Sequence, residues 1–436
     1  MARPRTWRLA VSAAIAGVLV LLALVLPDRC ATNELGHHRL GRTGDLALGE
    51  VPRAAAQEAR FARACPPDPA APASPTGPIL RAPYLQIVTA DAADVLWTSA
   101  PLADPVVAIW SPDLAGKEPR LVRAVVDPTA PLPRGRQYVA HLADLSPGVI
   151  HCYVVRDGAR VLAGPFGFTT APPRGDPRPI RLVAFGDMGF RSIDQRLVLA
   201  QMSRVESDLV LLAGDIAYPN GRLVELEQNL FATYAPLMHG APFFPASGNH
   251  DYLTEDAAPF RQAFALPGNG GPVGRERWYS FDWGDLHVVV LDSERLEKAQ
   301  TEWLDADLTA HADARWTIAL LHRAPFSSGE HGPDLPTRDA FVPILTRHRV
   351  ALVVAGHEHD YERFRPKDGV TYVVTGGGGR GTRRVGAPAQ DSAFAAQIAH
   401  FVYLVVERNR IRLWAVDASG QTFDTAELLH DGRPAG

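Results

Sequence analysis

The chain has 436 residues, of which 46% are hydrophobic and 21% charged, ordinary values for a globular protein with room for two or three domains. The 44 basic and 48 acidic side chains leave a formal net charge of −4, which excludes nucleic-acid binding through bulk positive charge. Three cysteines are too few for a disulfide scaffold or a cysteine-based zinc site, so any catalytic chemistry is expected from the 15 histidines and the carboxylates.

The N-terminus has the pattern of an export signal. Three arginines within the first eight residues precede an uncharged run of 18 residues, 9–26. The run is long enough to cross a bilayer and no small-residue cleavage site follows it, which favours a signal anchor over a cleaved signal peptide in residues 1–30. Both alternatives predict an exported protein, and the first adds a possible membrane tether. Outside the cytoplasm Cys30 and Cys65 could pair, although nothing in the sequence requires it.

Residues 31–78 are predicted to be a linker, because nine of the 28 residues in 51–78 are Ala and seven are Pro. From residue 79 to 172, short β-rich runs are separated by turn clusters, which predicts a small all-β sandwich. The predicted strands are 85–88, 95–97, 106–110, 122–126, 137–142 and 150–155. Cys152 lies in the last of them and is expected to be a small buried apolar residue.

After residue 179 the pattern changes to apolar strands that alternate with helices, which predicts an α/β domain over residues 178–428. The predicted strands are 180–185, 209–213, 287–291, 317–321, 351–355 and 372–375, followed by a hairpin of 401–406 with 411–414. The predicted helices are 193–205, 223–237, 301–311 and 337–348. In such domains the functional residues are expected where the strands end.

Metal-ligand residue types follow these strands one after another. The segments are Gly186-Asp187, Gly214-Asp215-Ile216-Ala217-Tyr218, Gly248-Asn249-His250, His322 and Gly356-His357-Glu358-His359. Each has an ordinary explanation when taken alone: Asp187 could cap a helix, and His322 could be a packed core histidine. Their repetition at successive strand ends of one domain indicates a metal centre.

The pattern GD…GDxxY…GNH…H…GHxH resembles the calcineurin-like metallophosphoesterases, and its details resemble the purple acid phosphatase branch. This resemblance implies a two-sheet sandwich flanked by helices, preceded by a fibronectin type III-like or Ig-like all-β module. Most metallophosphoesterases have a histidine where Gly189 stands, and Tyr218 replaces that ligand as in purple acid phosphatases. A phenolate is a hard anionic donor, which favours Fe(III). The family's corner tyrosine in the all-β module is replaced here by His151.

The resemblance also implies roles for the site residues. Asp187, Tyr218 and His359 would hold the first ion, and Asn249, His322 and His357 the second, with Asp215 as the bridge. The ions would be Fe(III) and a divalent Zn, Mn or Fe, and a metal-bound hydroxide would attack the phosphoester. His250 and His331 would contact the phosphate or protonate the leaving group. Gly376–Gly379 is expected to allow close approach of the backbone to the GHxH loop.

The predicted function is therefore an exported acid phosphatase that hydrolyses phosphate monoesters. Two alternatives remain open from the sequence. One is a phosphodiesterase, pyrophosphatase or phospholipid-cleaving enzyme with the same metal core. The other is a tethered surface-binding protein whose phosphoesterase domain is inert.

Overall fold

The computed structural model describes residues 50–52, 57–66, 79–112, 118–128, 130, 132 and 134–430. The predicted export segment of residues 1–30 lies outside the described residues, as does most of the predicted linker. Among the helices of the described part, none is both long enough and apolar enough to cross a membrane.

Residues 79–169 form an all-β region of two four-stranded antiparallel sheets, with strand orders β1-β2-β6-β5 and β4-β3-β7-β8. The strands are β1 (Ile79–Gln86), β2 (Ala93–Ser99), β3 (Pro105–Trp110), β4 (Arg120–Arg123), β5 (Val125–Val126), β6 (Arg136–Leu142), β7 (Ile150–Asp157) and β8 (Arg160–Thr169). Trp97 and Tyr138, from neighbouring strands, stack with ring centroids 5.4 Å apart in the buried core. The assignment of this region to the fibronectin or Ig type stays a prediction.

Two predictions are wrong here: part of the predicted linker is a helix, and Cys152 is not a free buried cysteine. Within the predicted linker, α2 (Gln57–Ala64) is a helix whose Phe61 is buried, and Cys65 forms a disulfide with Cys152 of β7. Cys65 therefore does not pair with Cys30. A Cβ on Gly167 or on Gly240 would lie 2.8 Å from Phe61, so these two glycines make room for its ring. The high Ala and Pro content of the segment gave no indication that Phe61 packs into the all-β region.

His151 makes the contact expected of the corner tyrosine that it replaces. Its ring Nε2 lies 3.0 Å from the backbone carbonyl oxygen of Ser146, five residues upstream. An imidazole N–H can donate to a carbonyl as a phenol O–H does. The replacement therefore preserves a hydrogen bond between the start of β7 and the preceding turn.

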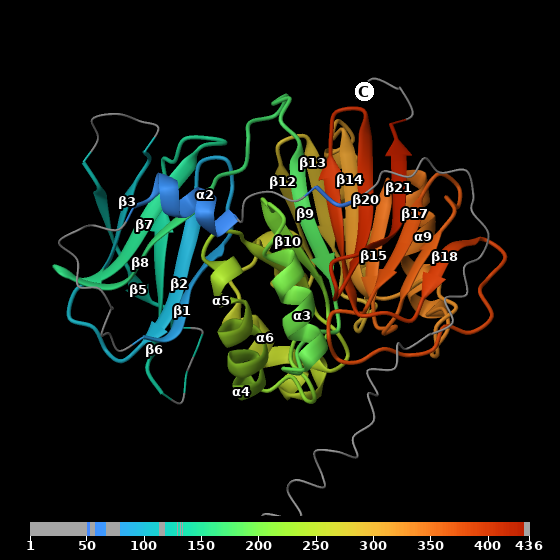
Figure 1. Ribbon diagram of the computed structural model, residues 1–436, viewed down its shortest axis with the longest axis horizontal. Helices are drawn as coiled ribbons and strands as arrows, with labels where there is room; N and C mark the ends of the chain where they lie inside the picture. Colours follow the sequence, from blue (N-terminus) through green and yellow to red (C-terminus); the bar gives the residue numbers. More distant parts are fainter. Residues whose placement is uncertain are drawn as a thin grey trace, which may run out of the picture. The chain divides into compact units, whose positions relative to one another are not determined.

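The remaining strands form the predicted two-sheet α/β domain. One sheet has the order β11-β10-β9-β19-β20-β21 and the other β12-β13-β14-β15-β17-β16-β18. The strands are β9 (Ile180–Phe185), β10 (Leu209–Ala213), β11 (Phe243–Ala246), β12 (Tyr279–Trp283), β13 (Leu286–Val290), β14 (Trp316–Arg323), β15 (Leu352–Gly356), β16 (Tyr361–Phe364), β17 (Thr371–Thr375), β18 (Ser392–Ala396), β19 (His400–Val406), β20 (Arg410–Asp417) and β21 (Thr422–Leu429). Figure 1 shows β9 in green beside red strands from the end of the chain, and β19 pairs directly with β9.

Successive side chains of an inner strand face two different cores. This explains why these strands are continuous hydrophobic runs in the sequence. In β13, Val288 and Val290 face the large core between the sheets, whereas Val289 belongs to a second core on the outer face. The helices α8 (Lys298–Ala310) and α9 (Leu335–Arg347) cover that outer face through Leu304 and Phe341. The helix α3 (Ile193–Met202) contacts β19 and β20 of the other sheet. Both sheets are thus covered on one side by helices, as predicted.

The predicted helix 223–237 is divided into three parts. α4 (Leu223–Glu225) passes into a π-helix, η1 (Leu226–Phe231), and then into α5 (Ala232–Met238).

The carboxyl ends of four strands meet in this domain. β9 pairs in parallel with β10, β14 pairs in parallel with β15, and β10 contacts both β14 and β15. The candidate ligands follow those ends.

Candidate metal centre

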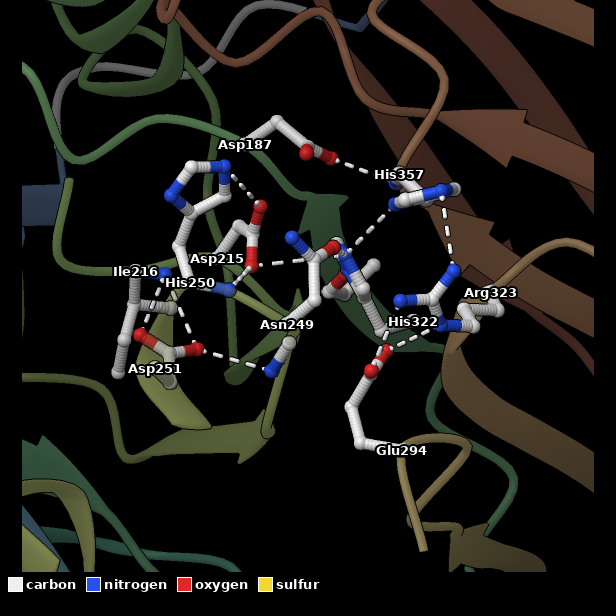
Figure 2. A network of polar contacts seen from close by, with 12 residues as sticks. Asp187, Asp215, Ile216, Asn249, His250, Asp251, Glu294, His322, Arg323 and His357 are labelled. Atoms are coloured by element: carbon white, nitrogen blue, oxygen red, sulfur yellow. Dashed lines mark hydrogen bonds and ion pairs between the residues drawn. The ribbon is translucent and has the colours of Figure 1, made fainter. Parts of the chain in front are cut away.

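Every residue predicted to bind metal lies at or after the end of a strand. Asp187 follows β9, Asp215 and Tyr218 follow β10, Asn249 follows β11, His322 is in the last two residues of β14, and His357 and His359 follow β15. Figure 2 shows the candidate ligands that it labels directed toward one another: Asp187, Asp215, Asn249, His322 and His357. The structure therefore brings together residues that are up to 172 positions apart (359 − 187) in the sequence.

The backbone at these strand ends has an unusual conformation. Asp187 has φ of 57°, Asp215 of 51° and His357 of 71°, all in the left-handed region. Glycines make the tight approach possible, since a Cβ on Gly356 would lie 2.7 Å from Oδ2 of Asp187. A Cβ on Gly376 would lie at the same distance from that oxygen, so the glycine run approaches the cluster as predicted.

The first half of the cluster surrounds the phenol oxygen of Tyr218. This oxygen lies 2.9 Å from Oδ1 of Asp187, 2.7 Å from Oδ2 of Asp215 and 3.1 Å from Nε2 of His359. All four side chains are buried. A phenol has one proton and can donate to only one of these acceptors at a time. Several electron-rich atoms around one point are better satisfied by a shared cation.

The second half surrounds Nε2 of His322, which lies 3.1 Å from Oδ1 of Asn249, 3.3 Å from Nδ1 of His357 and 3.5 Å from Oδ1 of Asp215. The other ring nitrogen, Nδ1, lies 2.8 Å from the carbonyl oxygen of Ala213. A carbonyl only accepts, so Nδ1 donates to it, and Nε2 is the nitrogen that faces the oxygens of Asn249 and Asp215. This half therefore also gathers electron-rich atoms around one point, where a shared cation would satisfy them.

The pKa shifts of the cluster residues show how strongly these buried groups interact. Burial and the carboxylates of Asp187 and Asp215 raise the pKa of Tyr218 well above its usual value. Burial and the neighbouring His322 lower the pKa of His357 far below its usual value. Burial and Asp215 raise the pKa of Asp251 to about 7, while Asp251 accepts the backbone N–H of Gly248 at 2.9 Å.

The donor set fits two neighbouring metal ions. Carboxylate, phenol and amide oxygens combined with imidazole nitrogens suit iron and zinc-like ions. Ligand atoms of Asp187, Asp215 and His322 all lie within 4.8 Å of one another. Asp215 contributes Oδ2 to the first half and Oδ1 to the second, which is the geometry expected of a bridging carboxylate.

The two predicted catalytic histidines lie at the rim of this cluster. Nδ1 of His250 lies 2.7 Å from the carbonyl oxygen of Pro219, and its Nε2 lies 3.9 Å from Oδ2 of Asp215. The ring of His331 lies 4.6 Å from that of His357, and its side chain is 44% exposed. Both imidazoles are therefore accessible beside the candidate ligands.

Several supporting residues were not assigned from the sequence. Arg323 lies 2.7 and 2.9 Å from the two carboxylate oxygens of Glu294, and its NH1 lies 3.4 Å from Nε2 of His357. Glu358, between the two motif histidines, is buried and accepts the backbone N–H of His331 at 2.8 Å. Glu294 belongs to no recognisable motif, so only the fold reveals its role.

A second cluster of possible metal ligands, Asp282, His287 and His311, lies apart from this site. Nδ1 of the buried His287 lies 2.8 Å from Asp282, and its Nε2 lies 2.9 Å from Asp307. Both ring nitrogens face carboxylates, which requires both to be donors and makes His287 an imidazolium. Its ring stacks on His311 with centroids 4.0 Å apart. We interpret this cluster as an ion pair between the buried His287 and the carboxylates of Asp282 and Asp307.

Comparison with known proteins agrees with this geometry. Residues 180–361, which contain all seven candidate ligands, match the family model described as calcineurin-like phosphoesterase. The chain contains a calcineurin-like phosphoesterase domain. Purple acid phosphatases are among its homologues: purple acid phosphatase 21 of Arabidopsis thaliana is 28% identical over 49% of this chain and 52% of its own length. A nucleotide pyrophosphatase/phosphodiesterase of Hordeum vulgare is 28% identical over 51% of this chain and 75% of its own length.

A solved structure supports the fold of the phosphoesterase domain. The purple acid phosphatase PPD1 from yellow lupin (Lupinus luteus) seeds superposes with a TM-score of 0.70 at 21% identity, over 81% of this chain and 75% of its own. The chain spans about half the length of the Mycobacterium tuberculosis and first Arabidopsis relatives that it matches. The domain is of the kind found in phosphoesterase hydrolases.

Proposed function

We propose that the protein is an exported, binuclear metal-dependent phosphatase that hydrolyses phosphate monoesters. The observation that carries this proposal is the position of Asp215. Its Oδ2 lies 2.7 Å from the phenol oxygen of Tyr218, and its Oδ1 lies 3.5 Å from Nε2 of His322. One carboxylate thus belongs to both halves of the cluster, as two adjacent cations require.

The ligand assignment follows the two halves. Asp187, Tyr218 and His359 would hold the first ion, Asn249, His322 and His357 would hold the second, and Asp215 would be shared by both. The anionic phenolate favours Fe(III) in the first half, and the second suits a divalent Zn, Mn or Fe. When bound, two such metal ions activate water at neutral or acidic pH and stabilise the charge of the phosphoryl group.

Two histidines at the rim of the metal cluster can donate protons during the reaction. The carbonyl of Pro219 accepts from Nδ1 of His250 at 2.7 Å, which fixes the ring and leaves Nε2 on the side of the cluster. Nε2 can then hold a proton for the leaving-group oxygen, a contribution of typically about 10²–10⁴-fold to the rate. His331 is the second candidate for this role, and Glu358 fixes its backbone position.

The exported location is supported by the Cys65–Cys152 disulfide. Disulfides persist in oxidising compartments and are rare in the cytosol. Attachment to a membrane through residues 9–26 remains part of the proposal. It is tested by fractionating cells that express the full chain and by determining the N-terminal residue of the protein recovered.

A phosphodiesterase or pyrophosphatase with the same metal core is the second candidate, and the similarity to the nucleotide pyrophosphatase/phosphodiesterase of Hordeum vulgare favours it. The structure of the metal cluster is common to both candidates. Monoester and diester hydrolysis, measured with p-nitrophenyl phosphate and bis-p-nitrophenyl phosphate at pH 5 and pH 8, distinguishes them directly.

The decisive experiment combines metal analysis with the variant Asp215→Asn. We expect two metal ions per chain in the wild type, and a loss of more than about a hundredfold in kcat/KM in the variant, because even residues that only support a ligand contribute about 10–100-fold. Asp368→Asn is the matched control, because exposed Asp368 has φ of 50° and Asp215 has 51°. Near-wild-type turnover of Asp215→Asn would overturn the bridging role, and metal-free protein without turnover would favour the inert surface-binding alternative.

A further inference from the structure

One buried side chain connects the two loops that supply most of the first half of the metal cluster. Asn229, on the π-helical turn η1, is buried beside the apolar residues Leu226 and Leu230. An amide in such surroundings is unfavourable unless its polar atoms are hydrogen-bonded. Its Nδ2 donates to the carbonyl oxygen of Gly189 at 2.8 Å and to that of Tyr218 at 2.9 Å. The amide group therefore links the loop after β9 to the loop after β10.

The two carbonyls fix the orientation of the Asn229 amide. A terminal amide has two N–H donors, and a carbonyl oxygen only accepts, so each donor serves one carbonyl. With the amide turned over, its own oxygen would face both carbonyls. The backbone of Asn229 is held as well, because Nε2 of Gln195 in α3 donates to its carbonyl oxygen at 2.8 Å. Asn229 is therefore a fixed point that holds both loops.

The carbonyl of Gly189 also joins the two loops directly. It accepts the backbone N–H of Tyr218 at 2.9 Å, and a Cβ on Gly189 would lie 2.0 Å from the carbonyl oxygen of Ile216. The turn that carries Tyr218 thus occupies the space that a side chain at position 189 would need. Asn229 holds this turn at both of its contacts with the loop after β9, one through Gly189 and one through Tyr218.

The position of the Tyr218 backbone determines where its phenol oxygen lies. The ring is rigid, so χ1 and χ2 are the only side-chain torsions that can move this oxygen. In the structure it lies 2.9 Å from Oδ1 of Asp187 and 2.7 Å from Oδ2 of Asp215. Without the donors of Asn229, the turn loses a hydrogen bond to Tyr218 and one to Gly189, and the phenol oxygen can move away from the two carboxylates.

We propose that Asn229 is the positioning residue for Tyr218 and thereby sets the affinity of the first half of the cluster for Fe(III). This inference rests on the proposed binuclear function and adds to it a residue that supplies no ligand atom. A hydrogen bond that supports a metal ligand contributes about 10–100-fold to metal affinity. The hydrogen bonds of the Asn229 amide involve the loops of the first half, so binding of the second, divalent ion should change less.

The test compares Asn229→Ala with Gln86→Ala in the full chain. Gln86 is the matched control, because it is also buried and its Nε2 also donates to two backbone carbonyls, those of Leu85 at 2.8 Å and Phe243 at 3.1 Å. Both variants should lose similar stability in urea. Only Asn229→Ala should shift the visible absorption maximum of the iron-loaded protein and lower its affinity for Fe(III), measured by competition with a chelator, by about 10–100-fold. Asn229→Asp fills the same space but offers at most one donor, so it should shift the maximum too.

A decrease of less than about threefold in the Fe(III) affinity of Asn229→Ala, or an equal decrease in Gln86→Ala, would overturn the positioning role and leave the phosphatase proposal intact. An unchanged absorption maximum in Asn229→Asp would overturn it as well, because filling the space would then be sufficient.

If the wild type binds no iron, the binuclear proposal fails, and amide hydrogen exchange of the metal-free protein tests the role of Asn229 separately. In that case the amide of Tyr218, which donates to the carbonyl of Gly189, should exchange at least about tenfold faster in Asn229→Ala than in Gln86→Ala, because the turn has lost two hydrogen bonds. Equal exchange rates in the two variants would show that Asn229 does not hold the turn.

Discussion

Removing the Cys65–Cys152 disulfide should destabilise the protein by a large amount. The two cysteines are 87 residues apart, and the loop-entropy relation for a closed loop of that length gives about 4.5 kcal/mol at 25 °C. Disulfides often contribute somewhat less than this relation gives, so we expect a loss of about 3–4.5 kcal/mol for the double variant Cys65→Ala/Cys152→Ala. The anchoring of α2 through Phe61 should weaken as well, because the bond holds the end of this helix against β7.

Urea unfolding followed by tryptophan fluorescence measures this effect. With a slope of about 3 kcal/mol/M, the loss corresponds to a decrease of about 1–1.5 M in the midpoint. Wild-type protein treated with a reductant should show the same decrease, and the double variant should not respond to the reductant. If the midpoints of oxidised, reduced and variant protein coincide, the bond does not constrain the unfolded chain, and the support that it gives to export is lost.

Three further predictions concern single residues. Tyr218→Phe should abolish the visible absorption of the iron-loaded protein while some hydrolysis remains, and an unchanged spectrum would exclude phenolate ligation. His287→Gln should cost about 2 kcal/mol at pH 5, because a buried hydrogen-bonded charge is lost. Burial lowers the pKa of His287, but Asp282 and Asp307 raise it overall, so this stabilisation is complete below about pH 6.5 and is lost as the pH rises through the folded pKa; a urea-midpoint difference that grows from pH 5 to pH 9 would contradict it. Gly356→Ala should lower the metal content measured after reconstitution, since its Cβ would lie 2.7 Å from a carboxylate oxygen of Asp187.

The strands that the sequence predicts well are those buried on both faces. The predicted strands 180–185 and 209–213 coincide with β9 and β10, because every residue in a strand between two layers can be apolar. The missed strand β16 (Tyr361–Phe364) is also buried, but it contains Glu362 and Arg363. Glu362 accepts from the N–H of Ser328 at 2.6 Å and Arg363 pairs with Asp424, partners that no local pattern reveals.

The helix α2 was missed for the opposite reason. Its surroundings are rich in Ala and Pro, and its fold depends on Phe61 and Cys65 finding partners far along the chain. Composition describes an average over a window, whereas a docked helix can depend on one aromatic ring and one covalent bond. The π-helical turn of η1 (Leu226–Phe231) likewise has no signal in the apolar pattern of its residues.

Most candidate ligands could be predicted because they belong to short motifs at strand ends, and parallel strands bring those ends together. The sequence does not determine which atoms face one another. Nε2 of His322 is free for a cation only because Nδ1 donates to the carbonyl of Ala213, a contact 109 residues distant. The neutralisation of Arg323 by Glu294 depends in the same way on the position of a loop 29 residues earlier in the chain.

The left-handed backbone at Asp187, Asp215 and His357 explains why these motifs contain glycine next to the ligand. Such a conformation destabilises a residue other than glycine by about 1–3 kcal/mol and persists only where its surroundings fix it. Each of the three directly follows a glycine, Gly186, Gly214 or Gly356, whose missing side chain lets the strand turn within two residues. The turn directs three side chains from separate strands toward one point before any ion arrives. Affinity for the ions is therefore gained at the expense of folding stability. We expect the metal-loaded protein to unfold at a higher urea concentration than the metal-free protein, because ions that bind only the folded chain stabilise it.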